Sequence, residues 1–329
     1  MPRNKERRLI LGVDLGGTKI ATALATAEGE ILTRGYCPTL GEAGSQDIIS
    51  SILRTIEETM SSGKVRLSQL LGIGVAAAAI IDSNRGMVIT SPNIPSVREV
   101  PLKHAVEQRF GIPTYVGNDA TLAALGEWYF GLKKSVANLI YITVSTGIGG
   151  GIIANGKLYT GAHGFAGEVG HMTIDVTGPK CNCGNVGCWE ALASGTALAR
   201  GAIREIRKGA NTSIAELVGG DLSRIDAKIV FQAAEGGDEL AKKLISRLAY
   251  YFGIGLVNLV NIFNPELILI GGGVAKMGDL LLQPAINLVK ERAYVTLAYD
   301  VEIKPALLGD DSGVLGAVAF VLDRSGQLQ

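Results

Sequence analysis

Short apolar runs alternate with amphipathic segments along the first half of the chain. The runs are bounded by glycine and polar turns, and they predict strands at 8–16, 69–81 and 113–119 and two strands within 19–37. Five apolar positions recur with helical spacing and predict one buried helix face between 45 and 60: Ile48, Ile49, Ile52, Leu53 and Ile56. Further helices are expected at 101–110 and 119–130. This alternation of strands and helices is typical of an α/β fold.

The same pattern starts again in the middle of the chain. Residues 11–32 and 140–159 share one design: an apolar strand, a polar glycine turn, a second strand, and a tight turn into a third. Each glycine turn presents backbone N–H groups at a hairpin tip, where they can form an anion-binding nest. An ordinary hairpin is the simpler explanation for one such turn. Two matching turns in one chain favour a polyphosphate held from both sides of a cleft.

Neither turn follows the other common phosphate-binding patterns. In the first, Thr18 precedes Lys19, and a strand follows where a P-loop needs a helix. In the second, Ile152 replaces the third glycine of the dinucleotide fingerprint, and the turn again opens into a strand. We therefore expect neither a P-loop protein nor a dinucleotide-binding fold.

A third glycine cluster lies at the end of a predicted strand and before an amphipathic helix, within 265–290. A turn of this kind can hold the base, ribose or phosphate of a nucleotide, or can simply allow close packing. The long apolar helix predicted at 239–263 suits the core of a second domain, and a small-residue helix is expected at 310–322. Because no linker rich in proline or serine divides the chain, any hinge should fall near 118–135 and 305–315.

Composition narrows the function classes. Glycine supplies 44 of 329 residues, which favours tight turns and close backbone approach to a ligand. The 31 basic and 31 acidic residues cancel, so a broad electrostatic nucleic-acid surface is not expected. No convincing targeting signal precedes Asp14, and no uninterrupted apolar run reaches the ~20 residues of a membrane helix. The expectation is a cytoplasmic protein without membrane partners, where lasting disulfides are uncommon.

Asp119 stands where a predicted strand ends and a helix begins. One interpretation is helix capping, which Asn118 or Asp119 could supply. The other is a general base that takes the proton from a hydroxyl attacking a phosphate. The two glycine hairpins that flank this position favour the general base.

Three of the four cysteines lie together in CNCGNVGC, ten residues after a histidine. One imidazole and three thiolates complete a tetrahedral zinc site, and this Cys3His set leaves no open position for water. The sequence therefore predicts a structural zinc ion held by His171, Cys181, Cys183 and Cys188, with Cys37 too remote to join. The same loop would fix Glu168 and Glu190, whose carboxylates suit sugar hydroxyls.

Together these motifs resemble the ROK family of sugar kinases and repressors. The resemblance runs through DLGGTK, SPNIP, GNDA, STGIGGG, GEVGH, CNCGNVGCWE, IGGGV and GDDSG, and so covers nearly the whole chain. It implies a two-domain α/β fold of the actin-like ATPase (ribonuclease H-like) type, with a sugar and ATP bound in a cleft between the domains. The expected domains are 1–118 with about 312–329, which is the smaller, and 119–311, which carries the zinc loop.

The resemblance also implies a role for each matching residue. Asp119 matches the catalytic base, which acts on the 6-hydroxyl of the sugar. The matching sugar ligands, besides Asp119, are Asn93, Asn118, Glu168, His171 and Glu190, with His171 shared between sugar and zinc. The nucleotide-side matches are Gly16, Gly17, Thr18, Lys19, Thr146, Gly147, Gly149, Gly272 and Gly273. Mg²⁺ would arrive with ATP and neutralise charge between its phosphates.

Two departures from the family pattern lie beside the expected sugar position. Ala78 and Ala79 stand where such kinases often have Pro-Gly. Ser96 and Val97 stand where such kinases often have a tryptophan after the motif PN-x-P-G. Both concern the sugar and leave the phosphate chemistry intact.

The sequence thus predicts an ATP-dependent hexose kinase, with glucose as the first candidate. Fructose, mannose, N-acetylglucosamine and N-acetylmannosamine remain alternatives because their kinases share the motif set. A sugar-responsive repressor is disfavoured by the thirteen residues before Asp14, too few for a helix-turn-helix domain. A catalytic zinc is disfavoured by its complete ligand set. The resemblance implies a homodimer or homotetramer, and the sequence does not decide between them.

Overall fold

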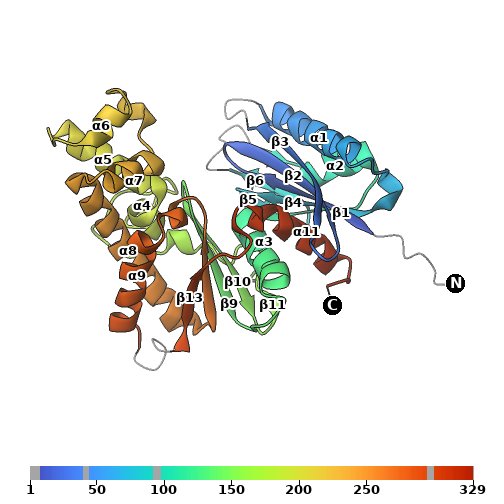
Figure 1. The fold of residues 1–329 in the computed structure, drawn as a ribbon. Helices are drawn as coiled ribbons and strands as arrows, with labels where there is room; N and C mark the ends of the chain where they lie inside the picture. The colour runs from blue at the N-terminus through green and yellow to red at the C-terminus, as the bar shows by residue number, and fades with distance from the viewer. Residues whose placement is uncertain (1–7, 40–43, 92–97, 295–299, 329) are drawn as a thin grey trace. The chain divides into compact units, whose positions relative to one another are not determined.

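Strands and helices alternate through most of the chain, as the sequence predicts. The computed structural model describes residues 8–39, 44–91, 98–294 and 300–328. By its internal contacts the chain forms two compact units (Figure 1). The first unit comprises Met1–Tyr141, Gly151–Gly167 and Ala306–Gln329, and the second comprises Ile142–Gly150 and Glu168–Pro305.

The first unit is built on a five-stranded sheet with the order β3-β2-β1-β4-β8. Its antiparallel half is a meander of three strands: β1 (Leu9–Leu15), β2 (Lys19–Thr26) and β3 (Ile31–Pro38). Its parallel half adds β4 (Leu70–Ala77) and β8 (Thr114–Asn118). The predicted strands at 8–16 and 113–119 and the pair within 19–37 are therefore confirmed.

Helices cover both faces of this sheet, and the alternation along β1 shows which residues meet them. Leu9, Leu11 and Val13 pack in the core formed with α1 (Ser45–Ser62) and α2 (Leu102–Phe110). Ile10 points to the opposite face, where it packs against α11 (Ser312–Arg324). The four isoleucines predicted on one helix face are buried on α1, and Leu53 is partly buried beside them.

Two paired glycines let α11 lie directly on the sheet. Gly12 of β1 and Gly74 of β4 are register partners. A Cβ on Gly12 would lie 2.4 Å from the carbonyl oxygen of Val314, and one on Gly74 would lie 2.0 Å from that of Ala317. Because side chains alternate along a strand, Asp14 shares this α11 face with Gly12.

Helix α3 (Asp119–Gly126) packs on α11 at a second glycine contact. A Cβ on Gly126 would lie 2.7 Å from the backbone nitrogen of Gly316, so the two helices touch backbone to backbone. The helix predicted at 119–130 changes character at Glu127, where a π-helical turn (Glu127–Gly131) follows.

The run predicted as one strand at 69–81 is two strands, and this prediction was wrong in detail. After the 3-10 turn Leu67–Gln69, β4 ends at Ala77, and β5 (Ile80–Asp82) starts a separate antiparallel sheet with β6 (Met87–Thr90) and β7 (Arg98–Val100). The break falls at Ala78 and Ala79, where the apolar pattern continues although the backbone leaves the sheet.

A second five-stranded sheet has the order β11-β10-β9-β12-β13. Its strands are β9 (Leu139–Val144), β10 (Ile148–Ala154), β11 (Lys157–Leu158), β12 (Leu267–Gly271) and β13 (Glu302–Pro305). The mid-chain hairpin and the strand before the third glycine cluster are thus confirmed. The amphipathic helix predicted after that cluster is α9 (Asp279–Arg292), and a 3-10 turn (Val274–Met277) precedes it.

The second unit is organised around α8 (Glu239–Phe263), the predicted core helix. It contacts four other helices: α4 (Trp189–Ala193), α5 (Gly195–Arg207), α7 (Ala227–Glu235) and α9 (Figure 1). The short α6 (Ser213–Leu217) packs on α7. Among the described residues, α8 alone is long and apolar enough to cross a membrane, but 56% of that apolar window is buried within the fold.

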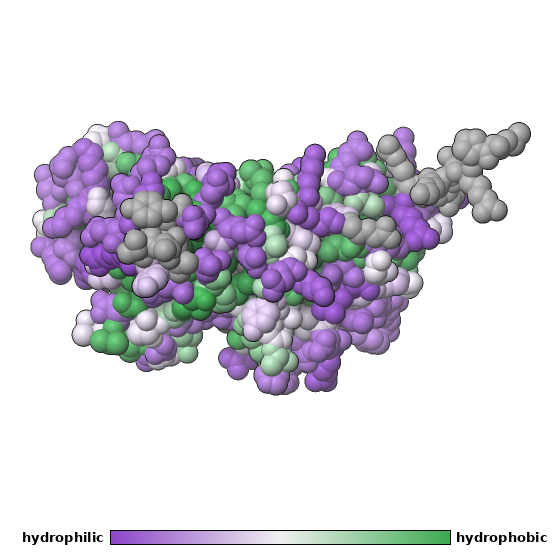
Figure 2. Space-filling model, turned by 90° about the horizontal axis from the view of Figure 1, so that it is seen from below, coloured by the Kyte–Doolittle hydropathy of each residue, from purple (hydrophilic) through white to green (hydrophobic). Residues whose placement is uncertain are grey.

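The remaining described elements are short 3-10 turns at Val169–His171, Leu222–Arg224 and Gly309–Asp311. Hydrophilic residues predominate on the face drawn in Figure 2, with hydrophobic residues scattered among them. The expected domain boundary at 118/119 stays a prediction, whereas the division by contacts keeps α3 with the first unit because of its packing on α11.

Candidate active site and metal centre

Asp119 is the first residue of α3, and Asn118 caps the helix in its place. The side-chain oxygen of Asn118 accepts a hydrogen bond from the Thr121 N–H at 3.0 Å. Its amide nitrogen donates to the Ala79 carbonyl at 3.3 Å, which ties the end of β8 to the segment between β4 and β5. The capping interpretation therefore belongs to Asn118, and the carboxylate of Asp119 is left for other chemistry.

Asp14 is a second acidic residue beside Asp119. Burial and, to a smaller extent, the negative charge of Asp119 raise the pKa of Asp14 to about 7, while Lys19 acts in the opposite direction. Burial also raises the pKa of Asp119, against hydrogen bonds from the Asp119 and Ala120 backbone. Two carboxylates in one partly buried place are typical of a functional site. The sequence interpretation did not include Asp14, although its position before the glycine turn and on the face of Gly12 was a usable signal.

The first glycine turn joins β1 to β2 and is held by Thr39, the residue after β3. Gly16 donates its N–H to the Lys19 carbonyl at 2.9 Å, so this amide serves the turn itself. Thr39 donates its hydroxyl to the Gly16 carbonyl at 2.9 Å and its N–H to the Thr18 carbonyl at 3.0 Å. Thr18 and Lys19 are exposed at the tip. With Gly17, they lie where a phosphate could approach the turn.

The second turn, between β9 and β10, is fixed by the start of α5. Ser145 donates its N–H to the Gly147 carbonyl at 2.9 Å, which closes the turn. Gly195 donates to the Ser145 carbonyl at 2.8 Å, and the Thr196 hydroxyl donates to the Thr146 carbonyl at 2.8 Å. The two bonds from α5 occupy carbonyl oxygens of the turn and so orient it.

The third glycine cluster packs against this second turn. Gly272 adopts φ of +90°, and a Cβ there would lie 2.4 Å from the Val144 carbonyl oxygen. A Cβ on Gly273 would lie 3.7 Å from the Ser145 hydroxyl. The structure thus brings the two predicted nucleotide-side turns of the second unit together, and only glycine fits Gly272 without strain.

Glu190 links the second turn to the cysteine-rich loop. Its Oε2 accepts a hydrogen bond from the Ile148 N–H at 2.9 Å, and a Cβ on Gly147 would lie 2.3 Å from the same oxygen. Its Oε1 lies 3.9 Å from the Cys181 sulfur. One carboxylate oxygen is therefore committed to the protein.

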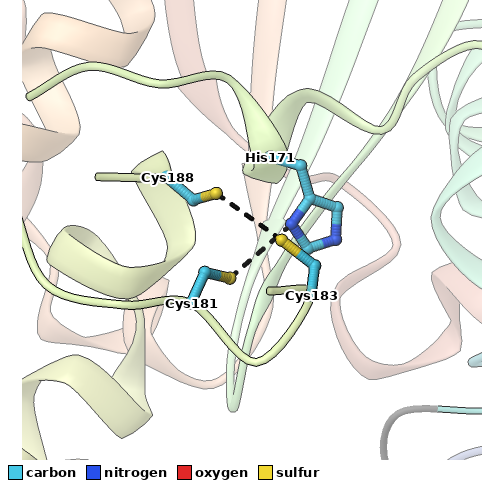
Figure 3. A group of neighbouring side chains, drawn as sticks. All are labelled: His171, Cys181, Cys183 and Cys188. Carbon is cyan, nitrogen blue, oxygen red and sulfur yellow. Dashed lines mark hydrogen bonds between the residues drawn. The ribbon is translucent and has the colours of Figure 1, made fainter. Parts of the chain in front are cut away.

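His171 and the three cysteines form a compact cluster (Figure 3). Their four candidate ligand atoms all lie within 4.8 Å of one another. The Cys183 and Cys188 sulfurs are 3.7 Å apart, and the Cys181 sulfur is 3.8 Å from His171 Nδ1. The other ring nitrogen, Nε2, lies 3.9 Å from a carboxylate oxygen of Glu168. His171 therefore faces the cysteines with one nitrogen and Glu168 with the other.

These distances fit a tetrahedral zinc ion. Zn–S bonds of about 2.3 Å at tetrahedral angles put two sulfurs about 3.8 Å apart, close to the spacing of Cys183 and Cys188. Burial and the neighbouring thiols raise the pKa of Cys188 to about 12. A cysteine binds metal as the deprotonated thiolate, so a bound divalent cation would offset the free-energy cost of deprotonating Cys188.

The loop backbone has its own supports around the cluster. Gly187 adopts φ of +71°, and a Cβ there would lie 1.6 Å from the Asp175 carbonyl oxygen. Trp189, next to Cys188, is fully buried, and its ring stacks on Phe252 of α8 at 5.4 Å between centroids. The loop is therefore anchored to the core helix directly beside Glu190.

A pocket of about 400 Å³ lies on another side of the same loop. Its lining includes Asp175 and Pro179 of the loop, Arg204 of α5 and Arg247 of α8. None of the predicted site residues lines it.

Among the residues expected beside the sugar, Asn93, Ser96 and Val97 lie outside the described residues, and Ala79 is buried.

The predicted site residues thus fall into two groups. Asp119, Asn118 and the first glycine turn belong to the first unit. Glu168, His171, Glu190, the three cysteines and the other two glycine turns belong to the second. Within each unit, the structure places its group at neighbouring element ends.

Comparison with known proteins identifies the family. The family model named ROK family matches residues 10–324 of this chain. The chain belongs to the ROK family. Its relatives include both functional classes of that family: a glucokinase from Halalkalibacterium halodurans is 38% identical over 98% of this chain and 97% of its own length. A putative xylose repressor from Caldicellulosiruptor is 40% identical over 97% of this chain and 79% of its own length.

A solved structure confirms the fold class. The ROK family glucokinase from Streptomyces griseus, crystallised in complex with glucose and AMPPNP, is 36% identical. It aligns with 95% of this chain and 98% of its own, with a TM-score of 0.82. The predicted α/β fold of the actin-like ATPase type is therefore confirmed for this ROK protein.

Proposed function

We propose that this ROK protein transfers the γ-phosphoryl group of ATP to a hexose, with glucose as the first candidate. The observation that carries the proposal is Asp119, a carboxylate with a raised pKa at a helix start that Asn118 already caps. The Streptomyces griseus relative, named for a complex with glucose and AMPPNP, supports both substrates.

In the proposed reaction Asp119 acts as the general base. The 6-hydroxyl of the sugar gives its proton to the Asp119 carboxylate and bonds to the γ-phosphorus, while the bond to the bridging oxygen breaks and ADP leaves. A base is most effective when its pKa lies near the working pH, and the burial of Asp119 moves its pKa in that direction.

We assign sugar binding to Asn118, Glu168, His171 and Glu190, and also to Asn93. The contact of Glu190 with the Ile148 N–H supports this assignment, because it leaves one carboxylate oxygen for a sugar hydroxyl and fixes its direction. A zinc ion bound by His171, Cys181, Cys183 and Cys188 would hold the loop without taking part in the reaction.

Phosphate binding would fall to the glycine turns. Their backbone amides suit phosphate oxygens, and Thr18 and Lys19 are exposed beside the first of them. The residues assigned are Gly16, Gly17, Thr18, Lys19, Thr146, Gly147, Gly149, Gly272 and Gly273. Mg²⁺ bound with ATP would neutralise phosphate charge.

The test is ADP release coupled to a dehydrogenase, with one sugar at a time. The panel is glucose, mannose, fructose, N-acetylglucosamine and N-acetylmannosamine, with xylose as a sugar that lacks the sixth carbon. Glucose should give the highest kcat/KM. If another hexose wins, Ala79 becomes a candidate specificity determinant. If no hexose supports ADP release by folded, zinc-loaded protein, the proposed activity is wrong.

Asp119→Asn should lower kcat by roughly 10²–10⁴ while sugar affinity, measured by calorimetry, stays close to that of the wild type. The matched control is Asp221→Asn, which alters an aspartate that caps a surface 3-10 turn, and it should leave kcat unchanged. Normal turnover by the Asp119 variant would remove this residue from the mechanism.

A sugar-responsive repressor is the second candidate, because a putative xylose repressor is 40% identical. The zero net charge argues against DNA binding by this chain alone. A gel shift with operator DNA, with and without xylose, separates the two functions.

We also propose that the protein is a homodimer or a homotetramer, which light scattering can distinguish.

A further inference from the structure

Glu127 is a fully buried carboxylate that the proposed reaction does not use. It lies where α3 passes into the π-helical turn, and such turns are frequent at functional sites. Its Oε2 accepts the Leu307 N–H at 2.9 Å, and its Oε1 accepts the Leu308 N–H at 3.0 Å and the Ser312 hydroxyl at 2.6 Å. A fully buried carboxyl group is tolerated only when its oxygens are hydrogen-bonded in this way.

The three donors of Glu127 all belong to one segment, which leads into α11. Ser312 is the first residue of α11, and Leu307 and Leu308 lie just before it. Arg34 of β3 pairs with both carboxylate oxygens of Asp311 from the other side, but on an exposed surface. Since exposed ion pairs contribute little, this pair should hold the start of α11 less firmly than the buried Glu127 does.

The two helices have no side-chain layer between them at this point. A Cβ on Gly316 would lie 2.1 Å from the Leu122 carbonyl oxygen, and one on Gly126 would lie 2.7 Å from the Gly316 nitrogen. Close-packed backbones transmit displacements, because no flexible side chain can absorb them.

Helix α3 carries one of the two acidic residues of the candidate site, and α11 contacts the other. Asp119 is the first residue of α3. Gly313, in the first turn of α11, lies directly on Asp14: a Cβ there would lie 2.7 Å from its Oδ2. The spacing of α3 and α11 therefore determines how closely Asp14 and Asp119 approach.

We propose that Glu127 is a positioning residue that sets the separation of Asp14 and Asp119 by holding the start of α11 against the end of α3. Its catalytic consequence rests on the proposed kinase function, whereas its effect on the two carboxylates does not. Glu127 itself touches no substrate in this proposal.

The experiment uses Glu127→Gln, which keeps the size of the side chain but presents an NH2 group to donors. Aspartates labelled with ¹³C at Cγ are titrated by NMR, and Asp14→Asn and Asp119→Asn assign the signals. In the wild type, Asp14 should titrate near pH 7. In Glu127→Gln its midpoint should fall by one pH unit or more, since the carboxylates separate and hydrate.

A second variant and a matched control keep the test decisive if Glu127→Gln folds poorly. Ser312→Ala removes one donor and should shift the midpoint in the same direction by less. Asp238→Asn alters a carboxylate that also accepts several hydrogen bonds, from Thr212, Ser213 and Ala241, but in the second unit. It should lower Tm and leave the Asp14 titration unchanged.

Kinetics give a separate readout. Glu127→Gln should lower kcat about 10-fold or more, with KM for sugar and ATP within about twofold, because misplacement acts on the reacting geometry. An unchanged Asp14 midpoint in a destabilised Glu127→Gln would overturn the proposal and leave Glu127 a purely structural residue. If the Asp14 midpoint shifts in Glu127→Gln but the wild-type protein phosphorylates no sugar, the kinase function is contradicted and the positioning role of Glu127 stands.

Discussion

At the scale of single residues, the raised pKa of Asp14 couples stability to pH. Burial and the Asp119 charge raise this pKa to about 7, whereas an aspartate in an unfolded chain titrates near 3.9. Between these values the folded protein binds more protons than the unfolded chain does. The free energy of unfolding should therefore decrease as pH rises from about 4 to about 7.

Asp14→Asn should remove the part of this loss that Asp14 causes and give a higher Tm than the wild type at pH 8, although the variant should be a poor enzyme. The measurement is Tm by calorimetry between pH 4 and pH 8. Asp119→Asn should retain part of the slope, because only the smaller of the two causes of the shift is removed. A wild-type Tm that is flat or rises over this range would contradict the assigned pKa.

The sequence identified Asp119 but not Asp14 or Glu127, and the reason is physical. A residue at a strand-to-helix junction stands out in a linear pattern, as Asp119 does. The environment of Asp14 depends on Gly313, which lies about 300 residues later in the chain. Glu127 lies in the apolar run GEWYF, where nothing indicates that backbone donors from 307 and 308 reach it.

At the scale of elements, the paired glycines of β1 and β4 should be among the least replaceable positions of the fold. Gly74→Ala would place a Cβ 2.0 Å from the Ala317 carbonyl oxygen, which is backbone and cannot rotate away. We expect a loss of about 1–3 kcal/mol or more in the free energy of unfolding, measured with denaturant.

The control for this prediction is Gly236→Ala, at the end of α7. Its backbone has φ of −73°, and the nearest atom to a new Cβ is 3.3 Å away. This change should be neutral or slightly stabilising, because alanine restricts the unfolded chain. Equal losses for both variants would show that α11 adjusts to the sheet more easily than the backbone contact implies.

Element types were more predictable than their boundaries. Long periodic segments such as α1 and α8 match their predicted ranges closely. The break between β4 and β5 was missed because alanines at 76–79 give no change in pattern. The helices between 195 and 235 carry no site motif, and the sequence interpretation did not address them.

At the scale of the whole molecule, loss of zinc should weaken sugar binding strongly and should affect the fold of the first unit little. All four candidate ligands and both glutamates beside them belong to the second unit. Cys183 is exposed, so Cys183→Ser alters the ligand set with little damage to packing. Zinc content should fall well below one ion per chain, and KM for the sugar should rise about 10-fold or more.

Zinc is measured by plasma emission spectroscopy and KM by the coupled assay. Cys37→Ser is the matched control, because Cys37 is buried in the first unit beside the Thr55 hydroxyl. It should keep one zinc ion per chain. A Cys183 variant with full zinc content and normal KM would contradict the ligand assignment.

The position of α11 on the first sheet has a consequence for biosynthesis. Strand β1 leaves the ribosome about 300 residues before the helix that covers its Ile10 and Gly12 face. At about 5–20 residues per second, that face waits roughly 15–60 s for its partner. During this interval the nascent chain exposes apolar surface that chaperones recognise, so its yield in a cell should depend on translation speed as well as on the stability of the finished fold.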